Sequence, residues 1–368
     1  MSETSFDSYC LLTVLMSGGS LIERSDTASM ADRSGRLQSV LTRRRVLALG
    51  SGGVLFGSGA WVARPPPVSD APGWSETASL PTARGEMKGA ELDGHLYVPG
   101  GLRRVARSTD QLTVYDPNAE EWTVGSSLPV GLNHHATAAL EGTLYVVGGN
   151  ESLTDDPERH AYAYDPDADT WEERPPLPDG RWGHEAVAFD GRLYVVGGVP
   201  ETDDELDTLV YDPTAEEWNR AAPIPTRREH VAAAVLDGQC FVVGGRWDGK
   251  NMAVVEAYDP ETDSWASRAE LEVARGGFGA TVLDSTLHAV GGENPGTVSG
   301  WTTAAHERYD VDTDRWERLP DAPLSVHGTV VASAANRLYV VGGAWRQGLW
   351  SATAWTDRVF VYDPTGDV

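Results

Sequence analysis

Residues 192–218 read RLYVVGGVPETDDELDTLVYDPTAEEW, and three markers in this stretch recur along the chain. An apolar run ends in a pair of glycines, Tyr211 precedes an aspartate, and Trp218 follows that tyrosine by seven residues. The apolar run is typical of a buried strand, and the segments around Tyr211 and Trp218 predict two more strands joined by a short turn. With EAVAF at 185–189, which an Asp-Gly turn joins to the run, they predict a unit of four strands.

The same unit recurs between residues 74 and 364. Six glycine pairs follow apolar runs at spacings of 48, 49, 47, 47 and 51 residues: Gly100-Gly101, Gly148-Gly149, Gly197-Gly198, Gly244-Gly245, Gly291-Gly292 and Gly342-Gly343. The tyrosines that precede an aspartate are Tyr115, Tyr164, Tyr211, Tyr258, Tyr309 and Tyr362. The tryptophans of the repeat are Trp74, Trp122, Trp171, Trp218, Trp265 and Trp316. Each of the first five tyrosines lies seven residues before the next tryptophan, so the markers belong to one repeating unit.

A period near 50 residues, four strands per unit and no helical pattern predict an all-β chain. The expected architecture is a six-bladed β-propeller of four-stranded antiparallel blades. The repeat resembles the Kelch family, whose units carry a glycine doublet, then Tyr, then Trp at about these separations. The resemblance covers residues 74–364. WD-type propellers are the alternative, but they would show Gly-His and Trp-Asp pairs every ~40–45 residues, which do not recur.

The last unit stops after its third strand, at residues 358–364, whereas the repeat region begins with a lone fourth strand around Trp74. We expect this N-terminal strand to complete the sixth blade and to close the ring, because the pairing would cover two open strand edges. The expected domain is residues 74–364, with a tail at 365–368.

Residues 1–60 are interpreted as an export signal region. TRRRVL at 42–47 resembles a twin-arginine motif; a glycine-rich apolar run and the small residues Ser-Gly-Ala at 58–60 follow it. The run is shorter than the ~20 apolar residues of a spanning helix, so we expect a secreted protein or one outside the cell envelope. An uncleaved signal would be its sole membrane attachment, and a cytosolic protein with a chance arginine run is the alternative. Met30 is a candidate for the true start, and residues 61–73 read as a Pro-rich linker.

The composition is strongly acidic, with a formal net charge of −26. This charge argues against nucleic acid or an anionic membrane surface as a partner, because both require a basic face. Acid excess with few lysines resembles proteins from high-salt organisms, and an ordinary acidic secreted protein is the alternative. We expect a monomer. Cys10 and Cys240 lie on opposite sides of the predicted cleavage site, so no internal disulfide is expected.

Alternating strand direction predicts that the two ends of the propeller differ. The turns between strands one and two and the Tyr-to-Trp turns fall on one face, and these turns are short and nearly identical. The loops between strands two and three and the connections between blades fall on the other face, the loop face. Nearly all of the variation in length lies there, so we expect ligand binding at the loop face.

Basic residues in the blade connections are the first candidates for ligand binding. Arg84, Arg181, Arg228 and Arg275 each precede a glycine pair by 16 residues, and His134, His184, His230 and His327 lie nearby. We expect these residues to surround the mouth of the central channel and to bind a carboxylate or an acidic loop of a partner. The alternative is that the arginines pair with acids such as Glu185 and Glu229 and with backbone carbonyls.

Tryptophans outside the repeat positions are the second set of candidates. The two longest loops of the loop face, 293–307 and 344–357, contain Trp301, Trp345 and Trp350. Exposed indoles at a channel mouth would suit sugar rings or partner side chains. The alternative is that the indoles pack these loops onto the blades.

The sequence predicts no metal site and no cofactor. Asp165, Asp167 and Asp169 alternate as at the start of a calcium-binding loop, but the glycine and distant glutamate of such a loop are missing, so the stretch is predicted to be a blade turn. Kelch-type rings include copper oxidases with a tyrosine cross-linked to a cysteine, and a sialic-acid epimerase. Cys240 lies within a predicted strand, which departs from the copper pattern. An acid-base enzyme could use Glu185, Glu229 or Glu293, but no spacing selects one of them.

These observations favour an exported Kelch-type module that binds a protein or carbohydrate ligand through its loop face. An enzyme that acts on a sugar at the channel mouth, of the epimerase, mutarotase or oxidase kind, is the alternative. No catalytic residue is assigned.

Overall fold

The computed structural model describes residues 65–366 except 105, 154, 203–205, 295–301, 347–350 and 352. The predicted export signal, the candidate start at Met30 and the first part of the linker lie outside the described residues. Within the described part of the chain, no helix combines the length and the hydropathy needed to cross a bilayer.

The 28 strands of the described residues form six four-stranded sheets and two small hairpins. The first two sheets, from inner to outer strand, are β2 (Ala90–Leu92), β3 (His95–Pro99), β6 (Leu112–Asp116) and β7 (Glu121–Gly125), then β8 (Ala136–Leu140), β9 (Thr143–Val147), β10 (Ala161–Asp165) and β11 (Thr170–Glu173). The next two are β12 (Arg181–Phe189), β13 (Arg192–Pro200), β14 (Thr208–Asp212) and β15 (Glu217–Ala221), then β16 (Ala232–Leu236), β17 (Gln239–Val243), β20 (Val255–Asp259) and β21 (Ser264–Arg268). The fifth is β22 (Gly279–Leu283), β23 (Thr286–Val290), β24 (His306–Asp310) and β25 (Arg315–Arg318). The sixth combines β26 (Val330–Ala334), β27 (Arg337–Val341) and β28 (Val359–Tyr362) with β1 (Trp74–Thr77).

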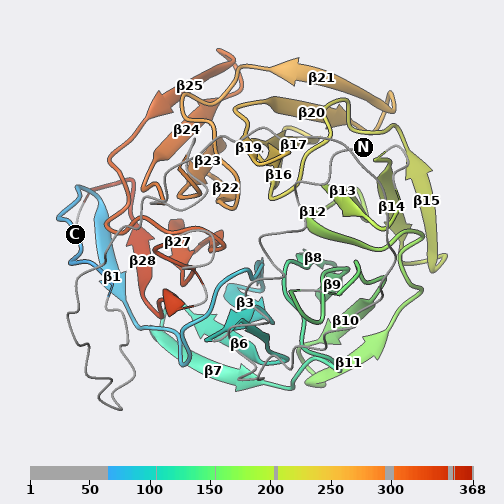
Figure 1. The fold of residues 1–368 in the computed structure, drawn as a ribbon, viewed down its shortest axis with the longest axis horizontal. Helices are drawn as coiled ribbons and strands as arrows, with labels where there is room; N and C mark the ends of the chain where they lie inside the picture. The colour runs from blue at the N-terminus through green and yellow to red at the C-terminus, as the bar shows by residue number, and fades with distance from the viewer. Residues whose placement is uncertain are drawn as a thin grey trace, which may run out of the picture. The chain divides into compact units, whose positions relative to one another are not determined.

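These sheets are the blades of a six-bladed β-propeller, which confirms the predicted fold class. They are arranged as a ring around a central channel, with β2, β8, β12, β16, β22 and β26 innermost (Figure 1). Every neighbouring pair of strands within a blade is antiparallel. In the sixth blade, β1 is the outer strand and pairs with β28, with Trp74 opposite Tyr362.

The glycine doublets permit adjacent blades to approach closely. The second glycine of each doublet donates its N–H to a backbone carbonyl of the next blade, over 2.7–3.0 Å: Gly101 to Leu132, Gly149 to Arg181, Gly198 to Arg228, Gly245 to Arg275, Gly292 to Val326 and Gly343 to Arg84. A Cβ atom on the first glycine would collide with the same carbonyl, at 2.6 Å for Gly148 and Arg181. Both glycines also have positive φ, as at Gly148 (62°) and Gly149 (94°), which other residues rarely adopt.

The repeat tryptophans join each blade to the one before it. Each indole Nε1–H donates to a carbonyl just after the outer strand of the preceding blade, over 2.8–3.2 Å: Trp122 to Ala78, Trp171 to Ser126, Trp218 to Pro175, Trp265 to Ala222, Trp316 to Ala269 and Trp74 to Pro320. The tyrosine of the same blade packs on the indole, with 4.9 Å between the ring centroids of Tyr164 and Trp171. One contact of this kind therefore recurs at all six blade junctions.

The alternating aspartates build the turn between tyrosine and tryptophan. Asp165 accepts hydrogen bonds from the N–H groups of Asp167 (2.9 Å) and Ala168 (3.1 Å). Asp169, at a φ of 52°, accepts from the Tyr164 hydroxyl (2.6 Å) and from the N–H of Ser126 in the preceding blade (2.7 Å). The carboxylates are thus used for turn geometry and blade docking, as predicted from the repeat.

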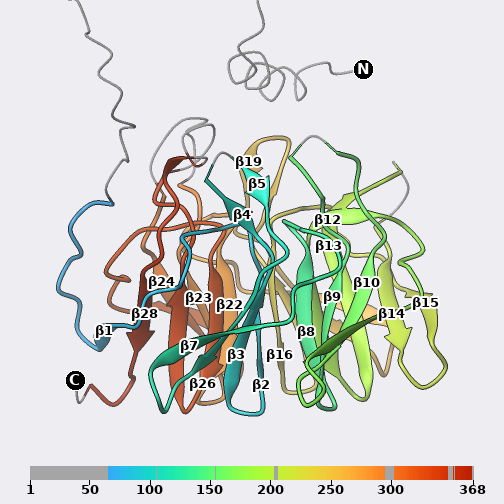
Figure 2. The same cartoon turned by 90° about the horizontal axis from the view of Figure 1, so that it is seen from below.

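The two ends of the propeller differ as predicted. Short turns lie at one end, and longer segments rise at the other, including the hairpins β4–β5 (Leu102–Arg103 and Arg107–Ser108) and β18–β19 (Arg246–Trp247 and Lys250–Asn251) (Figure 2). The apolar core fills the spaces between blades. One cluster, for example, joins Phe241 and Val243 of the fourth blade to Phe278 and Tyr309 of the fifth. The loop face is therefore carried on a rigid ring.

Removal of β1 should destabilise the whole ring. A chain that starts at Ala78 lacks Trp74, which is 7% exposed and packs against His306 and Tyr362. We expect the free energy of unfolding in urea to fall by at least ~3–5 kcal/mol, as for the loss of other buried aromatic side chains. A chain that starts at Val68 retains β1 and is the control. Equal urea midpoints for the two truncated chains would contradict a stabilising role of β1.

Two buried histidines should make stability depend on pH. His288 and His306 hydrogen-bond each other over 2.9 Å, and burial lowers the pKa of His288 to about 4 and that of His306 to about 3. The unfolded chain takes up protons below its ordinary histidine pKa near 6.5, whereas the folded chain does not. The free energy of unfolding should therefore fall by ~1.4 kcal/mol per pH unit for each histidine as the pH drops from about 6.5 towards 4. Urea titrations should show a smaller slope in His306→Gln and an unchanged slope in His95→Gln, at an exposed position.

Candidate functional site at the channel mouth

A series of left-handed residues surrounds the channel at the loop face. One residue in each blade, 14 positions before the first glycine of the doublet, has a φ between 48° and 66°: Glu86, His134, Gly183, His230, Gly277 and Gly328. Five of these residues donate their N–H to the carbonyl of the preceding member, over 2.7–3.0 Å: His134, Gly183, His230, Gly277 and Gly328. We call these six residues the neck ring. The ring fixes the backbone, so its three side chains converge on the channel axis.

Glu86, His134 and His230 supply those side chains, and their ligand atoms all lie within 4.8 Å of one another. Nε2 of His134 is 3.4 Å from Oε2 of Glu86, and the rings of His134 and His230 pack edge to face at 5.0 Å. Trp182 covers both imidazoles, with ring centroids at 5.5 and 5.6 Å. Gly328 makes room for Glu86, because a Cβ atom there would lie 2.7 Å from the carboxyl carbon.

A second layer of charged residues surrounds the neck ring. Arg246 bonds Glu229 through Nε (2.7 Å) and Glu293 through Nη1 (2.5 Å). Glu229 also bonds Nδ1 of His230. His327, which is 2% exposed, lies with Nδ1 at 3.4 Å from Glu86 and 3.8 Å from Glu293. The mouth therefore gathers three carboxylates, three imidazoles and one guanidinium from different blades.

Burial and mutual charge shift the pKa values of this cluster. Burial alone would raise the pKa of Glu86, but His134, His327, Arg246 and Lys88 together hold that pKa below its usual value. Burial lowers the pKa of His134 in spite of Glu86. Burial, assisted by Arg246, lowers the pKa of His230 well below its usual value. These shifts favour the ionised form of Glu86 and weaken proton binding by His134 and His230.

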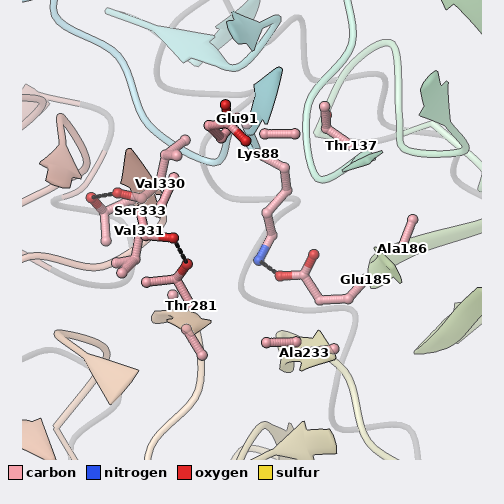
Figure 3. Close-up of a pocket in the computed structure, with 17 residues that line it drawn as sticks. Lys88, Glu91, Thr137, Glu185, Ala186, Ala233, Thr281, Val330, Val331 and Ser333 are labelled. Carbon is pink, nitrogen blue, oxygen red and sulfur yellow. Dashed lines mark hydrogen bonds and ion pairs between the residues drawn. The ribbon is translucent and has the colours of Figure 1, made fainter. Parts of the chain in front are cut away.

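A cavity of about 200 Å³ occupies the channel next to the neck ring. Lys88 and Glu185 face each other across it and form an ion pair (Figure 3). Burial raises the pKa of Glu185, and Lys88 opposes that rise. The rest of the wall is made of small residues and hydroxyls, including Ala233, Thr137 and Thr281. The cavity is therefore polar, and its lining includes one cation, Lys88, and two carboxylates, Glu91 and Glu185.

The four predicted arginines do not surround the mouth. Arg84, Arg181, Arg228 and Arg275 are 0–1% exposed, and their guanidinium groups point into the blades. Arg228 bonds Glu256 and the carbonyls of Gly244 (2.8 Å) and Val242 (3.0 Å). Arg275 bonds Glu307 and the carbonyl of Ala289 (3.1 Å). The expected position was wrong because each guanidinium bonds carbonyls of its own blade, and those of Arg228 and Arg275 also bond an acid on its third strand.

The predicted histidines divide between mouth and core. His134 and His230 belong to the neck ring, whereas His184 is buried and its Nε2 bonds the Val147 carbonyl (3.1 Å). Cys240 is a free buried thiol, and burial raises its pKa to about 12, which fits the structural role expected from its place in a strand.

Trp345 is also a core residue, at 4% exposure in the cluster of Leu324 and Val326, so the expectation of an exposed indole was wrong there. Trp301 and Trp350 lie outside the described residues. The described aromatic side chains at the loop face include Trp182, Trp247, which lies 4.5 Å from the Arg227 guanidinium, and Trp355 of the loop 344–357, which donates to the Arg103 carbonyl over 3.2 Å.

Sequence reasoning missed Glu86 and Arg246, although a signal for the mouth was present. Aligning the units on the glycine doublets places Glu229 and His327 in the column 15 residues before it, and Arg246 and Glu293 in the column two residues after its first glycine. These two columns form a backbone bridge in several blades, as between Glu229 and Arg246. Charged residues that recur at these two bridged positions of the repeat would have identified the mouth.

Comparison with known proteins agrees with this architecture. The family model described as the KLHDC2/KLHL20/DRC7 Kelch-repeats domain matches residues 86–292, more than half of the chain. The chain belongs to the Kelch-repeat family. No curated protein matches this Kelch propeller. A solved structure titled "Structure of YjhT" is similar to it, with a TM-score of 0.66 and 18% identity over 78% of this chain and 99% of that one. That likeness concerns the fold.

The buried arginines should matter for stability of the Kelch propeller. Arg275 and Glu307 are both 0% exposed, so Arg275→Leu leaves an unpaired carboxylate inside the fifth blade. We expect the free energy of unfolding in urea to fall by ~3–5 kcal/mol. Arg275→Leu with Glu307→Leu should recover part of this loss, because no buried charge remains. Arg318→Ala, at an exposed pair with Asp321, should cost at most ~1 kcal/mol. A parent-like midpoint for Arg275→Leu would contradict the structural role.

Proposed function

We propose that this Kelch propeller is a binding module whose loop face captures a protein ligand through an acidic segment. The observation that carries the proposal is the set of exposed arginines on the β4–β5 hairpin, Arg103, Arg104 and Arg107, in a chain with a net charge of −26. Guanidinium groups bind carboxylates through two parallel hydrogen bonds, so such a hairpin suits an acidic ligand.

The β18–β19 hairpin supports the same reading. It belongs to the fourth blade and the β4–β5 hairpin to the first, so the two hairpins flank the channel mouth from opposite sides of the ring (Figure 1). Arg227 stacks on Trp247 of this hairpin, and Lys250 is exposed at its end. Tryptophan and arginine are enriched among the residues that dominate binding energy at protein interfaces. Kelch propellers commonly mediate protein interactions, which is consistent with this use of the loop face.

A carbohydrate ligand, or an enzyme that acts on a sugar, is the second candidate. The favouring observation is the group of Glu86, His134 and His230 next to a polar cavity that contains Lys88 and Glu185. An ionised carboxylate beside neutral imidazoles can move a proton between two positions of a sugar. We further propose that the protein acts outside the cytoplasm, because of the twin-arginine-like motif at 42–47.

Charge reversal separates these candidates. Arg103→Glu with Arg107→Glu should weaken capture of proteins from the source organism's envelope fraction at least ~10-fold, and salt should weaken capture by the parent. Arg315→Glu, at an exposed position of the turn face, is the matched control. Mass analysis of the native chain from the same fraction should give an N-terminus after Ala60 if it is exported and processed.

Unchanged capture by the charge-reversed hairpin would contradict the proposed binding face. Turnover of a sugar by the parent, lost in Glu86→Gln, would support the enzyme candidate instead.

A further inference from the structure

Each of the three histidines at the mouth donates one ring N–H to an oxygen. Nδ1 of His134 faces Oδ1 of Asn133, whose orientation is set because its Nδ2 donates to the Asn150 carbonyl (2.8 Å). Nε2 of His327 faces the Arg346 carbonyl (2.9 Å). A carbonyl oxygen can only accept, so these ring nitrogens carry the protons.

His230 follows the same rule. Its Nδ1 faces the Glu229 carboxylate, and its Nε2 accepts from Arg246 Nη2 (3.2 Å). His134 and His327 therefore each direct the nitrogen without a proton towards Glu86, whereas Nε2 of His230 already accepts from Arg246. Nε2 of His134 and Nδ1 of His327 lie 3.4 Å from the two carboxylate oxygens of Glu86.

Acceptor atoms that converge without a hydrogen between them repel one another. His327 is 2% exposed, so its side chain is shielded from bulk water. Its Nδ1 has no hydrogen-bond donor among the described residues. We propose that Glu86, His134 and His230 bind a divalent transition-metal ion of the zinc type at the channel mouth, with His327 beside them. A cation placed between these atoms would turn the repulsion into coordination.

The charge balance of the mouth is also suited to a cation. The neck contains three carboxylates, Glu86, Glu229 and Glu293, and one cation, Arg246, beside the balanced ion pair of Lys88 and Glu185. Lys88 is paired with Glu185, and Arg246 with Glu229 and Glu293. Glu86 is the carboxylate with only histidines as its ion-pair partners here. A divalent ion would neutralise the remaining excess of two negative charges.

The donor set indicates which metal. One carboxylate and two imidazoles are typical zinc ligands, with metal–ligand distances of ~2.0–2.2 Å, and a three-residue set leaves a position for water or a ligand. Donor atoms within 4.8 Å of one another need only a small contraction to reach this geometry. The contacts of His134 with Asn133 and of His230 with Glu229 are the outer-shell hydrogen bonds that usually orient metal-binding histidines. Calcium is disfavoured, because it prefers six to eight oxygen ligands.

The test uses the untagged full chain after removal of metal with a chelator. Equilibrium dialysis against Zn²⁺ at pH 7.5, followed by elemental analysis, should give one zinc ion per chain, and Ca²⁺ at the same concentration should not displace it. Glu86→Gln and His134→Gln should each weaken zinc binding at least ~100-fold, more than the loss of an outer-shell partner. His160→Gln is the matched control, because it removes the exposed group of Glu151, Glu158 and His160 and should leave binding unchanged.

Three results would overturn the proposal: no zinc uptake by the parent, uptake unchanged in both neck variants, or uptake lost in His160→Gln. Because a neck variant can fail to fold, the parent loaded with Co²⁺ gives an independent test. X-ray absorption should show nitrogen and oxygen ligands with at least two imidazoles. A ligand shell of oxygen alone, or one that contains sulfur, would place the ion elsewhere and refute the site.

Discussion

The N–H of the second glycine in each doublet, bonded to a carbonyl of the next blade, is the contact on which the rest of the propeller depends. It occurs at all six junctions, and the last of them, Gly343 to Arg84, closes the inner ring. A side chain on the first glycine would collide with the accepting carbonyl, so only glycine permits this approach. The contact holds the blade connections near the axis, and the residues one and two positions after each acceptor then form the mouth.

The same contact explains how the two sets of charged residues separate. The residue that supplies the carbonyl is an arginine in four blades, and its side chain turns into its own blade, where carbonyls and the acids Glu256 and Glu307 surround the guanidinium. The following residues lie on the channel side, where the neck ring forces their backbone into the left-handed region. Buried cations therefore stabilise the blades, whereas buried carboxylates and imidazoles gather on the axis. The arginine that stabilises the blade and the first residue of the mouth are therefore neighbours along the chain, as with Arg228 and Glu229.

The fold could be predicted because each unit repeats the same sequence markers. The glycine doublet, the tyrosine and the tryptophan are local consequences of one blade junction, and six copies leave little freedom in the number of strands. The predicted site was less accurate for a physical reason. A repeated position in the units gives the place of a residue along the chain but not the direction of its side chain. Arg228 points into its blade because the carboxylate of Glu256, 28 residues later, accepts a hydrogen bond from its guanidinium. The mouth is also assembled from distant side chains, since Glu86 and His134 are 48 residues apart and His134 and His230 are 96 apart, so no short motif contains it.

The neck ring has free space for a side chain at one of its glycines, Gly277. Of its three glycines, Gly328 is packed against Glu86 and Gly183 against His230, but a Cβ atom at Gly277 would have its nearest neighbours at 3.6 Å, in ordinary contact. The backbone there has a φ of 65°, a conformation that His134 and His230 already tolerate at 51° and 52°. A side chain at this position would have space at the axis, at a cost in backbone strain because L residues rarely adopt this φ. The residues that hold the ring together thus differ from those that face its centre, so the residues at the centre can change while the contacts between blades are kept.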